Sequence, residues 1–172
     1  MEQKNTIPGY EDSPERLRPS GIHVNQEGDW YYQGDKITRQ DVLETFITNL
    51  HLVSGGTFVI EWMGQRCTIE VEDTPFIVSR VDRVRSGDDI GEEIVLYLKN
   101  LPAREVLDPS TLTIGEGNIP YCTVRSGQFR ARFSRPAYYQ LASWIEQETR
   151  TDTFYLELNG RRYPLEMAAP SS

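Results

Sequence analysis

Hydrophobic and polar residues alternate in short runs along most of the chain, a pattern typical of half-buried β-strands. Ile22 and Val24 alternate with polar residues, and the aromatic run 30–32 follows a turn as the return strand of a hairpin. Further alternating runs, each interrupted by a turn containing glycine, predict hairpins over 57–71 and 153–167. We therefore expect a fold that consists mainly of antiparallel strand pairs.

Two segments change from this alternation to helical spacing. Thr38 is the predicted N-cap of a helix over 38–50, with Asp41 as the acidic member of a capping box. Ser134 is the predicted N-cap of a second helix over 134–146. The apolar residues that recur every three or four positions are Val42, Leu43, Phe46, Ile47 and Leu50 in the first, and Tyr138, Tyr139, Ala142 and Ile145 in the second.

The order of elements in the first half of the chain recurs in the second half. Each half has a hairpin, then a helix, then a second hairpin, and Thr38 and Ser134 lie 96 residues apart. At this offset, 57–71 and 153–167 are identical at six of fifteen positions, namely Thr57/Thr153, Phe58/Phe154, Glu61/Glu157, Gly64/Gly160, Arg66/Arg162 and Glu70/Glu166. The pattern predicts an α+β fold of two similar lobes that arose by internal duplication, each with a helix packed on antiparallel hairpins.

The repeat also predicts how the chain is divided. We expect a flexible N-terminal arm over 1–20, a first lobe over 21–100, and a connection over 101–120 that contains three prolines. A second lobe over 121–168 and a short tail over 169–172 complete the predicted organisation.

Composition and charge exclude several classes of protein. The 172 residues carry a net charge of −8, which argues against a general nucleic-acid or anionic-membrane partner. The longest apolar runs have three or four residues, whereas a membrane helix needs about 20. Residues 1–21 lack the apolar core of a signal peptide. Cys67 and Cys122 each lie in an alternating run, so we expect free buried thiols and a cytoplasmic protein.

The sequence offers little support for catalysis or metal binding. His23 lies in a predicted strand and His51 at a predicted helix end, and neither belongs to a known catalytic motif. The acidic residues in 88–93 lack the spacing of a calcium loop, and the glycine-rich stretch 115–118 lacks the Gly-Lys-Ser/Thr of a phosphate loop. We expect a protein that is not an enzyme, with no cofactor and no metal.

Arginines in the second half are the strongest candidates for a binding function. Residues 121–172 hold seven arginines and five acidic residues, whereas 1–120 hold 11 basic and 21 acidic residues. Arg130 and Arg132 alternate with apolar residues, so both guanidinium groups leave one face of a predicted strand. Guanidinium groups suit bidentate recognition of phosphate or carboxylate. The two arginines either bind an anionic ligand or pair with the acidic first lobe.

Two stretches resemble a known family. Residues 28–37, Gly-Asp-Trp-Tyr-Tyr-Gln-Gly-Asp-Lys-Ile, with the helix that follows, are similar to the aromatic hairpin and first helix of the bacterial domain of unknown function 1285. Residues 71–76, Val-Glu-Asp-Thr-Pro-Phe, resemble the acidic-Pro-Phe corner of that family. The resemblance covers about 21–167, but 101–120 cannot be aligned. It implies a duplicated two-domain fold with a pleckstrin-homology-like second lobe, a nucleotide-like ligand between the lobes, and a role in signal transduction.

Two functions remain open. In the first, the chain is a non-enzymatic regulatory or sensing module that binds a small anionic, nucleotide-like ligand between its lobes. The candidate ligand-binding residues are Arg130 and Arg132 on one wall, Asp73 and Phe76 beside a chain-turning proline on the other, and Tyr31, whose neighbours in the strand face the opposite way. In the alternative, the chain is a protein–protein interaction module that uses exposed sheet edges and takes no small ligand. The sequence indicates no oligomeric state.

Overall fold

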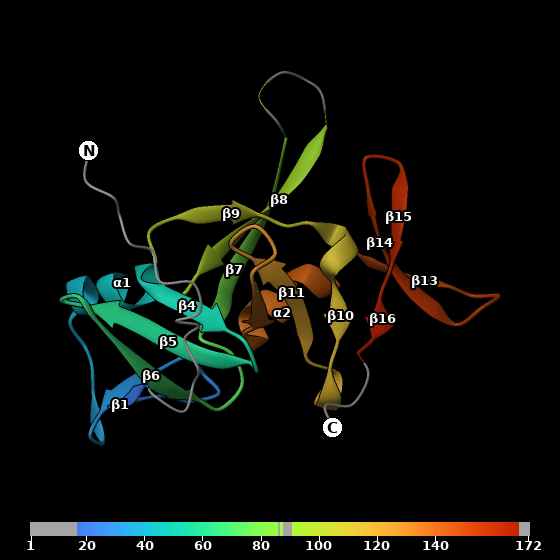
Figure 1. Cartoon of the computed structure of the whole chain (residues 1–172). Coiled ribbons are helices and arrows are strands. Elements are labelled where there is room, and N and C mark those ends of the chain that lie inside the picture. The colour runs from blue at the N-terminus through green and yellow to red at the C-terminus, as the bar shows by residue number, and fades with distance from the viewer. Residues whose placement is uncertain (1–16, 86, 88–90, 169–172) are drawn as a thin grey trace, which may run out of the picture.

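The computed structural model describes residues 17–85, 87 and 91–168 of the chain. Most of the predicted N-terminal arm and the whole predicted tail lie outside these residues. Within these described residues the fold is mixed α/β, mostly strands with two helices, in two main sheets and one small sheet (Figure 1). Neither α-helix in the described residues, one of nine and one of eight residues, has the length and apolar character needed to span a membrane.

The first sheet has six strands in the order β3-β2-β1-β6-β5-β4. Its pairs are antiparallel except for β1 and β6, which run parallel. Helix α1 (Gln40–Thr48) buries Leu43 and Ile47 in the core beside this sheet. The strands are β1 (Arg18–Val24), β2 (Trp30–Tyr32), β3 (Asp35–Lys36), β4 (Leu50–Val53), β5 (Thr57–Trp62) and β6 (Gln65–Val71).

The second sheet has seven strands in the order β16-β10-β11-β12-β7-β8-β9. Strands β7 and β8 form a long two-stranded arm, and helix α2 (Arg135–Ala142) packs against β7 (Figure 1). The strands are β7 (Phe76–Arg85), β8 (Glu92–Leu98), β9 (Arg104–Val106), β10 (Thr113–Ile114), β11 (Pro120–Val124), β12 (Phe129–Phe133) and β16 (Glu166–Met167). Two short 3₁₀ turns, Pro109–Thr111 and Glu116–Asn118, flank β10.

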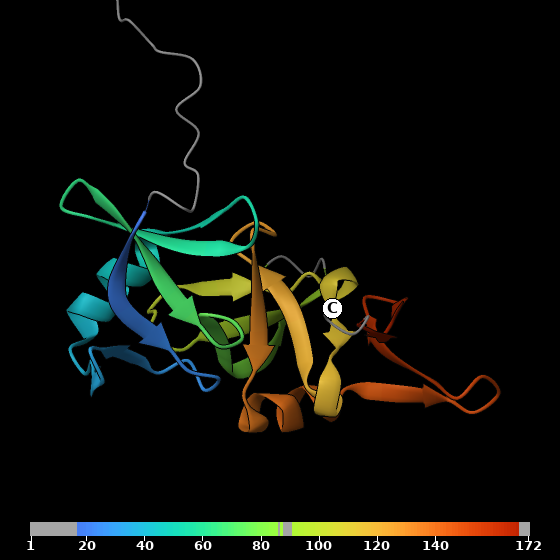
Figure 2. The same cartoon turned by 60° about the horizontal axis from the view of Figure 1, so that its bottom comes forward.

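A small third sheet follows α2 and lies at the end of the molecule opposite α1 (Figure 2). It has three antiparallel strands in the order β13-β14-β15, which are β13 (Ile145–Glu148), β14 (Thr153–Leu158) and β15 (Arg161–Pro164). Asn159, at the predicted Asn-Gly turn between β14 and β15, has a φ of 54° and Gly160 a φ of 72°. These left-handed values are the ones that a two-residue hairpin turn requires, which explains why this sequence turns here.

Both helices are shorter than the sequence predicted. Helix α1 begins after Arg39 rather than Thr38, and Arg39 donates two hydrogen bonds to the Asp41 carboxylate, which therefore makes no capping box. The cap of α2 is confirmed, because Ser134 Oγ accepts a hydrogen bond from the backbone N of Ala137 at 3.3 Å. The residues after each helix form β4 and β13, and the predicted helices extended into the first residues of these strands, Leu50 of β4 and Ile145 and Glu146 of β13.

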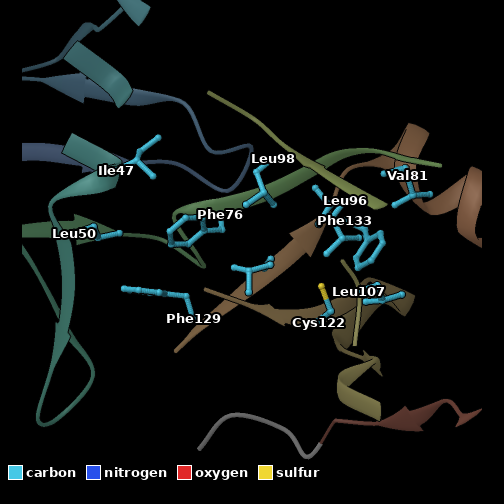
Figure 3. Close-up of a cluster of buried hydrophobic side chains, with 14 of the residues drawn as sticks. Ile47, Leu50, Phe76, Val81, Leu96, Leu98, Leu107, Cys122, Phe129 and Phe133 are labelled. Atoms are coloured by element: carbon cyan, nitrogen blue, oxygen red, sulfur yellow. The ribbon is translucent and has the colours of Figure 1, made fainter. Parts of the chain in front are cut away.

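The two main sheets share one hydrophobic core, which Figure 3 shows in close-up. Phe129 of β12 and Phe76 of β7 lie at its centre, with ring centroids 5.0 Å apart. Ile47 of α1 and Leu50 of β4 approach from the side of the first sheet. The Cys122 thiol is buried as predicted, whereas Cys67, also predicted to be buried, is only half-buried. Burial of these side chains supplies the main free energy that holds the sheets together.

The second sheet crosses the predicted boundary between the lobes. Strand β7, from the predicted first lobe, pairs in parallel with β12 from the predicted second lobe, with Val78 opposite Phe133. The three strands after each helix have the same antiparallel order, β4-β5-β6 and β13-β14-β15. The strands before each helix have different partners, because β1 pairs in parallel with β6 whereas β11 pairs with β10 and β12.

Candidate functional site

The corner that follows β6, residues 72–75, joins the two main sheets, and its first residue binds the first sheet. The backbone N of Glu72 donates to the carbonyl oxygen of Val24 at 3.0 Å. The Glu72 carboxylate accepts from the backbone N of Gln26 at 3.3 Å and lies 2.9 Å from Nε2 of His23. These contacts attach the corner to the end of β1.

The next residue of the corner, Asp73, binds the second sheet. One carboxylate oxygen, Oδ2, accepts from the Tyr121 hydroxyl at 2.7 Å and from Nη1 of Arg132 at 3.2 Å. The side chains of Asp73 and Arg132 are only 18% and 21% exposed, so this ion pair is largely removed from water. Burial raises the pKa of Tyr121, and the hydrogen bond to Asp73 and the charge of that carboxylate raise it further. Arg132 therefore acts in the way that the pairing alternative predicts.

Arg130, two residues before Arg132, has a different environment. Its guanidinium lies over the Tyr121 ring, 3.5 Å from the centroid, a cation–π contact that fixes the plane of the group. A Cβ at Gly115 would lie 2.6 Å from this ring and 3.3 Å from Nη2 of Arg130, so only glycine allows the loop to approach so closely. Within the described residues Arg130 forms no ion pair. Its N–H donors are thus held in a fixed plane, with no acidic partner among the residues that the structure describes.

Backbone contacts set the position of this cluster. Thr74 Oγ1 donates a hydrogen bond to the carbonyl oxygen of Arg130, which connects the corner directly to β12. The β11–β12 hairpin places Tyr121 opposite Arg132, and Arg125 and Ser126 at its turn have φ values of 54° and 56°. We call Asp73, Tyr121, Arg130 and Arg132 the joint cluster.

The structure brings together three of the five predicted site residues. Asp73, Arg130 and Arg132 meet in the joint cluster, although Asp73 contacts Arg132 directly rather than facing it across a groove. The prediction for Phe76 is wrong, because its ring is 2% exposed and packs in the core. Tyr31 lies on β2 beside His23, with ring centroids 6.2 Å apart, and has no contact with the two arginines.

The sequence analysis missed Tyr121, although one signal for it was present. A predicted turn at 126–127 pairs residue 121 with residue 132, and the structure has this register. An aromatic hydroxyl directly across from Arg132 was therefore predictable.

A second polar site that the sequence did not indicate is a cavity of about 510 Å³ between the β7–β8 arm and the third sheet. Asn159 closes one side, because its side chain accepts from the backbone N of Glu92 at 2.6 Å and donates to the Glu92 carbonyl oxygen at 2.9 Å. Arg83 lies 2.6 Å from the Glu92 carboxylate. Both signs of charge line this cavity, and Arg83 is already paired with an acid.

Among the residues that the structure describes, no group of three His, Cys, Asp or Glu side chains is arranged to hold a metal ion. The sequence matches no family model and no curated protein.

Two solved structures are similar to the chain. The first is the crystal structure of a DUF1285 family protein from Silicibacter pomeroyi DSS-3, with a TM-score of 0.68 and 21% identity over 95% of this chain and 92% of the other. The second is a DUF1285 family protein from Shewanella baltica OS155, with a TM-score of 0.59 and 15% identity over 72% of this chain and 91% of the other. The resemblance noted in the sequence is confirmed for the fold: over nearly its whole length, the chain folds like the DUF1285 family proteins.

Proposed function

We propose that this chain is a non-enzymatic regulatory or sensing module that binds a small anionic, nucleotide-like ligand at the joint cluster and acts in signal transduction. Arg130 carries the proposal, because a guanidinium held flat on an aromatic ring keeps its edge donors available for a phosphate or carboxylate. The exposed face of a stacked guanidinium also suits a nucleobase, which would add a second contact to the same ligand.

Arg132 and Asp73 have a supporting role in this proposal. Their ion pair holds the corner against β12 and fixes the Tyr121 ring through its hydroxyl group. A ligand held by Arg130 would therefore lie where the two sheets join, and its binding would respond to small movements of the joint. This coupling is the physical basis for proposing a sensing role rather than simple storage of a ligand.

The test is a thermal-shift screen of the parent protein against mono-, di- and cyclic nucleotides. A ligand at about 100 times its Kd adds about 2.7 kcal/mol, which for a chain of this size raises Tm by about 5–10 °C. The variant Arg130→Gln should lose the shift while its own Tm without ligand stays near that of the parent. Arg104→Gln is a matched control, because Arg104 is also exposed and lies 5.5 Å from the centre of the Tyr97 ring.

A parent protein whose melting temperature no nucleotide shifts would overturn the proposal. That result would favour the alternative function, an interaction module that uses sheet edges. Strand β4 is one edge of the first sheet, and its Leu52 is 45% exposed. Strand β9 is one edge of the second sheet, and its Val106 is 56% exposed. Such edges suit strand addition by a partner protein.

We also propose that the helix and the three strands after it are a duplicated unit. Strands β5 and β14 begin and end at residues that are 96 positions apart, the offset that the sequence repeat predicts. The different strand partners before each helix would then reflect later divergence of the two halves. The pleckstrin-homology-like character of the second half stays a prediction.

A further inference from the structure

An apolar groove of about 530 Å³ lies between α1 and the first sheet, formed by elements other than those of the joint cluster. Ile22 of β1 and Ile60 of β5 form its floor and are buried. Val42 and Phe46 of α1 form one wall, and Trp62 at the end of β5 lies at its margin. The volume falls within the range of about 300–1,000 Å³ that is usual for small-molecule sites.

Two aromatic rings that line this groove, Phe46 and Trp62, belong to a continuous series of ring contacts. Phe46 stacks on the buried Trp30 with centroids 6.3 Å apart, and Trp62 meets the edge of Phe46 at 5.3 Å. Trp62 is nevertheless 42% exposed, and Tyr32 of β2, which also lines the groove, is 48% exposed. Large aromatic side chains left open to water beside an apolar floor form a surface that an apolar ligand would cover.

One end of the groove is charged. Within the described part of the chain, Arg18 of β1 is the charged side chain among the groove-lining residues, and it forms no ion pair there. The register of β1 against β6 shifts between Pro19 and His23, where Gly21 has a φ of 78°. Arg18 lies just before this shift, and such irregularities in a strand often re-aim side chains beside binding sites.

We propose that this groove binds a small carboxylic acid with a linear hydrocarbon chain, with the carboxylate at Arg18 and the chain against Phe46 and Trp62. A single guanidinium matches the charge and the two oxygens of a carboxylate. The uncharged lining matches a hydrocarbon body, whose transfer from water to an apolar surface is favourable. The proposal does not depend on the function of the joint cluster.

A thiol assay locates the ligand. Cys67 of β6 lines the groove and is half-buried, whereas Cys122 is 1% exposed and burial raises its pKa to about 12. A disulfide reagent should therefore react with Cys67 alone in the folded protein. Saturating sodium decanoate is expected to slow this reaction about tenfold or more. An unchanged rate at every decanoate concentration below micelle formation would overturn the proposal.

Variants then separate the two ends of the ligand in calorimetric titrations. Arg18→Ala should weaken decanoate binding about tenfold and leave the binding of decanol unchanged. Val42→Glu, which adds a carboxylate to the groove wall, should weaken decanoate more than decanol. Arg85→Ala removes an exposed arginine from outside the groove and should change neither. Melting curves of each variant without ligand identify any loss of folding.

Two results would contradict the assignment. Equal decanoate affinity in the parent and in Arg18→Ala would show that Arg18 does not hold the carboxylate. Equal weakening by Arg85→Ala would show that decanoate responds to overall charge rather than to this groove.

Discussion

Replacing Asp73 with alanine tests whether the corner holds the two main sheets together. The substitution removes the hydrogen bonds from Tyr121 and Arg132 and leaves a largely buried guanidinium without its carboxylate. A hydrogen bond to a charged group contributes about 1.5–3 kcal/mol, and an unpaired buried partner adds a further cost. Both side chains keep about a fifth of their surface in water, which reduces these contributions. We therefore expect Asp73→Ala to lower the free energy of unfolding by about 2–3 kcal/mol in total, near the lower end of the sum of these contributions.

The assay is urea denaturation at pH 7, followed by circular dichroism. Asp73→Asn keeps an acceptor oxygen without the charge, so its loss should be about 1 kcal/mol. Asp35→Ala removes an exposed acid from β3 and is the matched control, with an expected change within about 0.5 kcal/mol. If Asp73→Ala were as stable as Asp35→Ala, the corner contacts would not hold the joint, and the reasoning would be refuted.

Titration of Tyr121 gives an independent readout of the same contact. Burial, the hydrogen bond to Asp73 and the charge of that carboxylate all raise the Tyr121 pKa, so stability from this group is complete below pH 10 and is lost as the pH rises through the folded-state pKa. Asp73→Ala removes both the hydrogen bond and the carboxylate charge. Of the three causes, only burial then still raises the Tyr121 pKa. The ultraviolet difference spectrum between variant and parent should therefore show one tyrosine that ionises at lower pH in the variant.

Three other outcomes are expected. Phe129→Ala should cost about 3–5 kcal/mol in urea denaturation, because its ring is 4% exposed and lies at the core centre. Phe154→Ala should cost less than about 1 kcal/mol, because that ring is 50% exposed. Burial raises the pKa of Asp29, but the hydrogen bonds and charges of Lys99 and Lys36 outweigh burial, so the net effect lowers this pKa. The stability that Asp29 contributes is therefore present above pH 3.8 and is lost as the pH falls below that value. In Lys99→Met, acid denaturation should begin at a higher pH.

The local elements of the fold were largely predictable from the sequence. Alternation and turn residues located both hairpins after the helices, and the Ser134 cap is confirmed. The helix ends were not predictable, because Leu50 and Ile145 satisfy the helical spacing and also begin strands β4 and β13. Both residues are apolar at a position where the two periodicities coincide, and only the partner strand decides between them.

The arrangement of the sheets was beyond a single sequence. The parallel pairs β1–β6, β7–β12 and β10–β16 join segments that are far apart in the chain, and no turn sets their register. The wrong prediction for Phe76 has the same origin. The first three residues of β7, Phe76, Ile77 and Val78, are all buried, so both faces of the strand are covered at this end, and only the arrangement of the sheets determines this.

Arg130 and Arg132 of the joint cluster have the same pattern in the sequence but different roles in the structure. Arg130 and Arg132 leave the same face of β12, as the alternation predicted, yet one stacks on Tyr121 and the other pairs with Asp73. The difference comes from the corner, which reaches Arg132, and from Gly115, which approaches Arg130. A double substitution would therefore combine a loss of stability with any loss of binding. Separate variants distinguish them, since Arg132→Ala should lower the free energy of unfolding by about 1–2 kcal/mol and Arg130→Ala by less than about 1 kcal/mol.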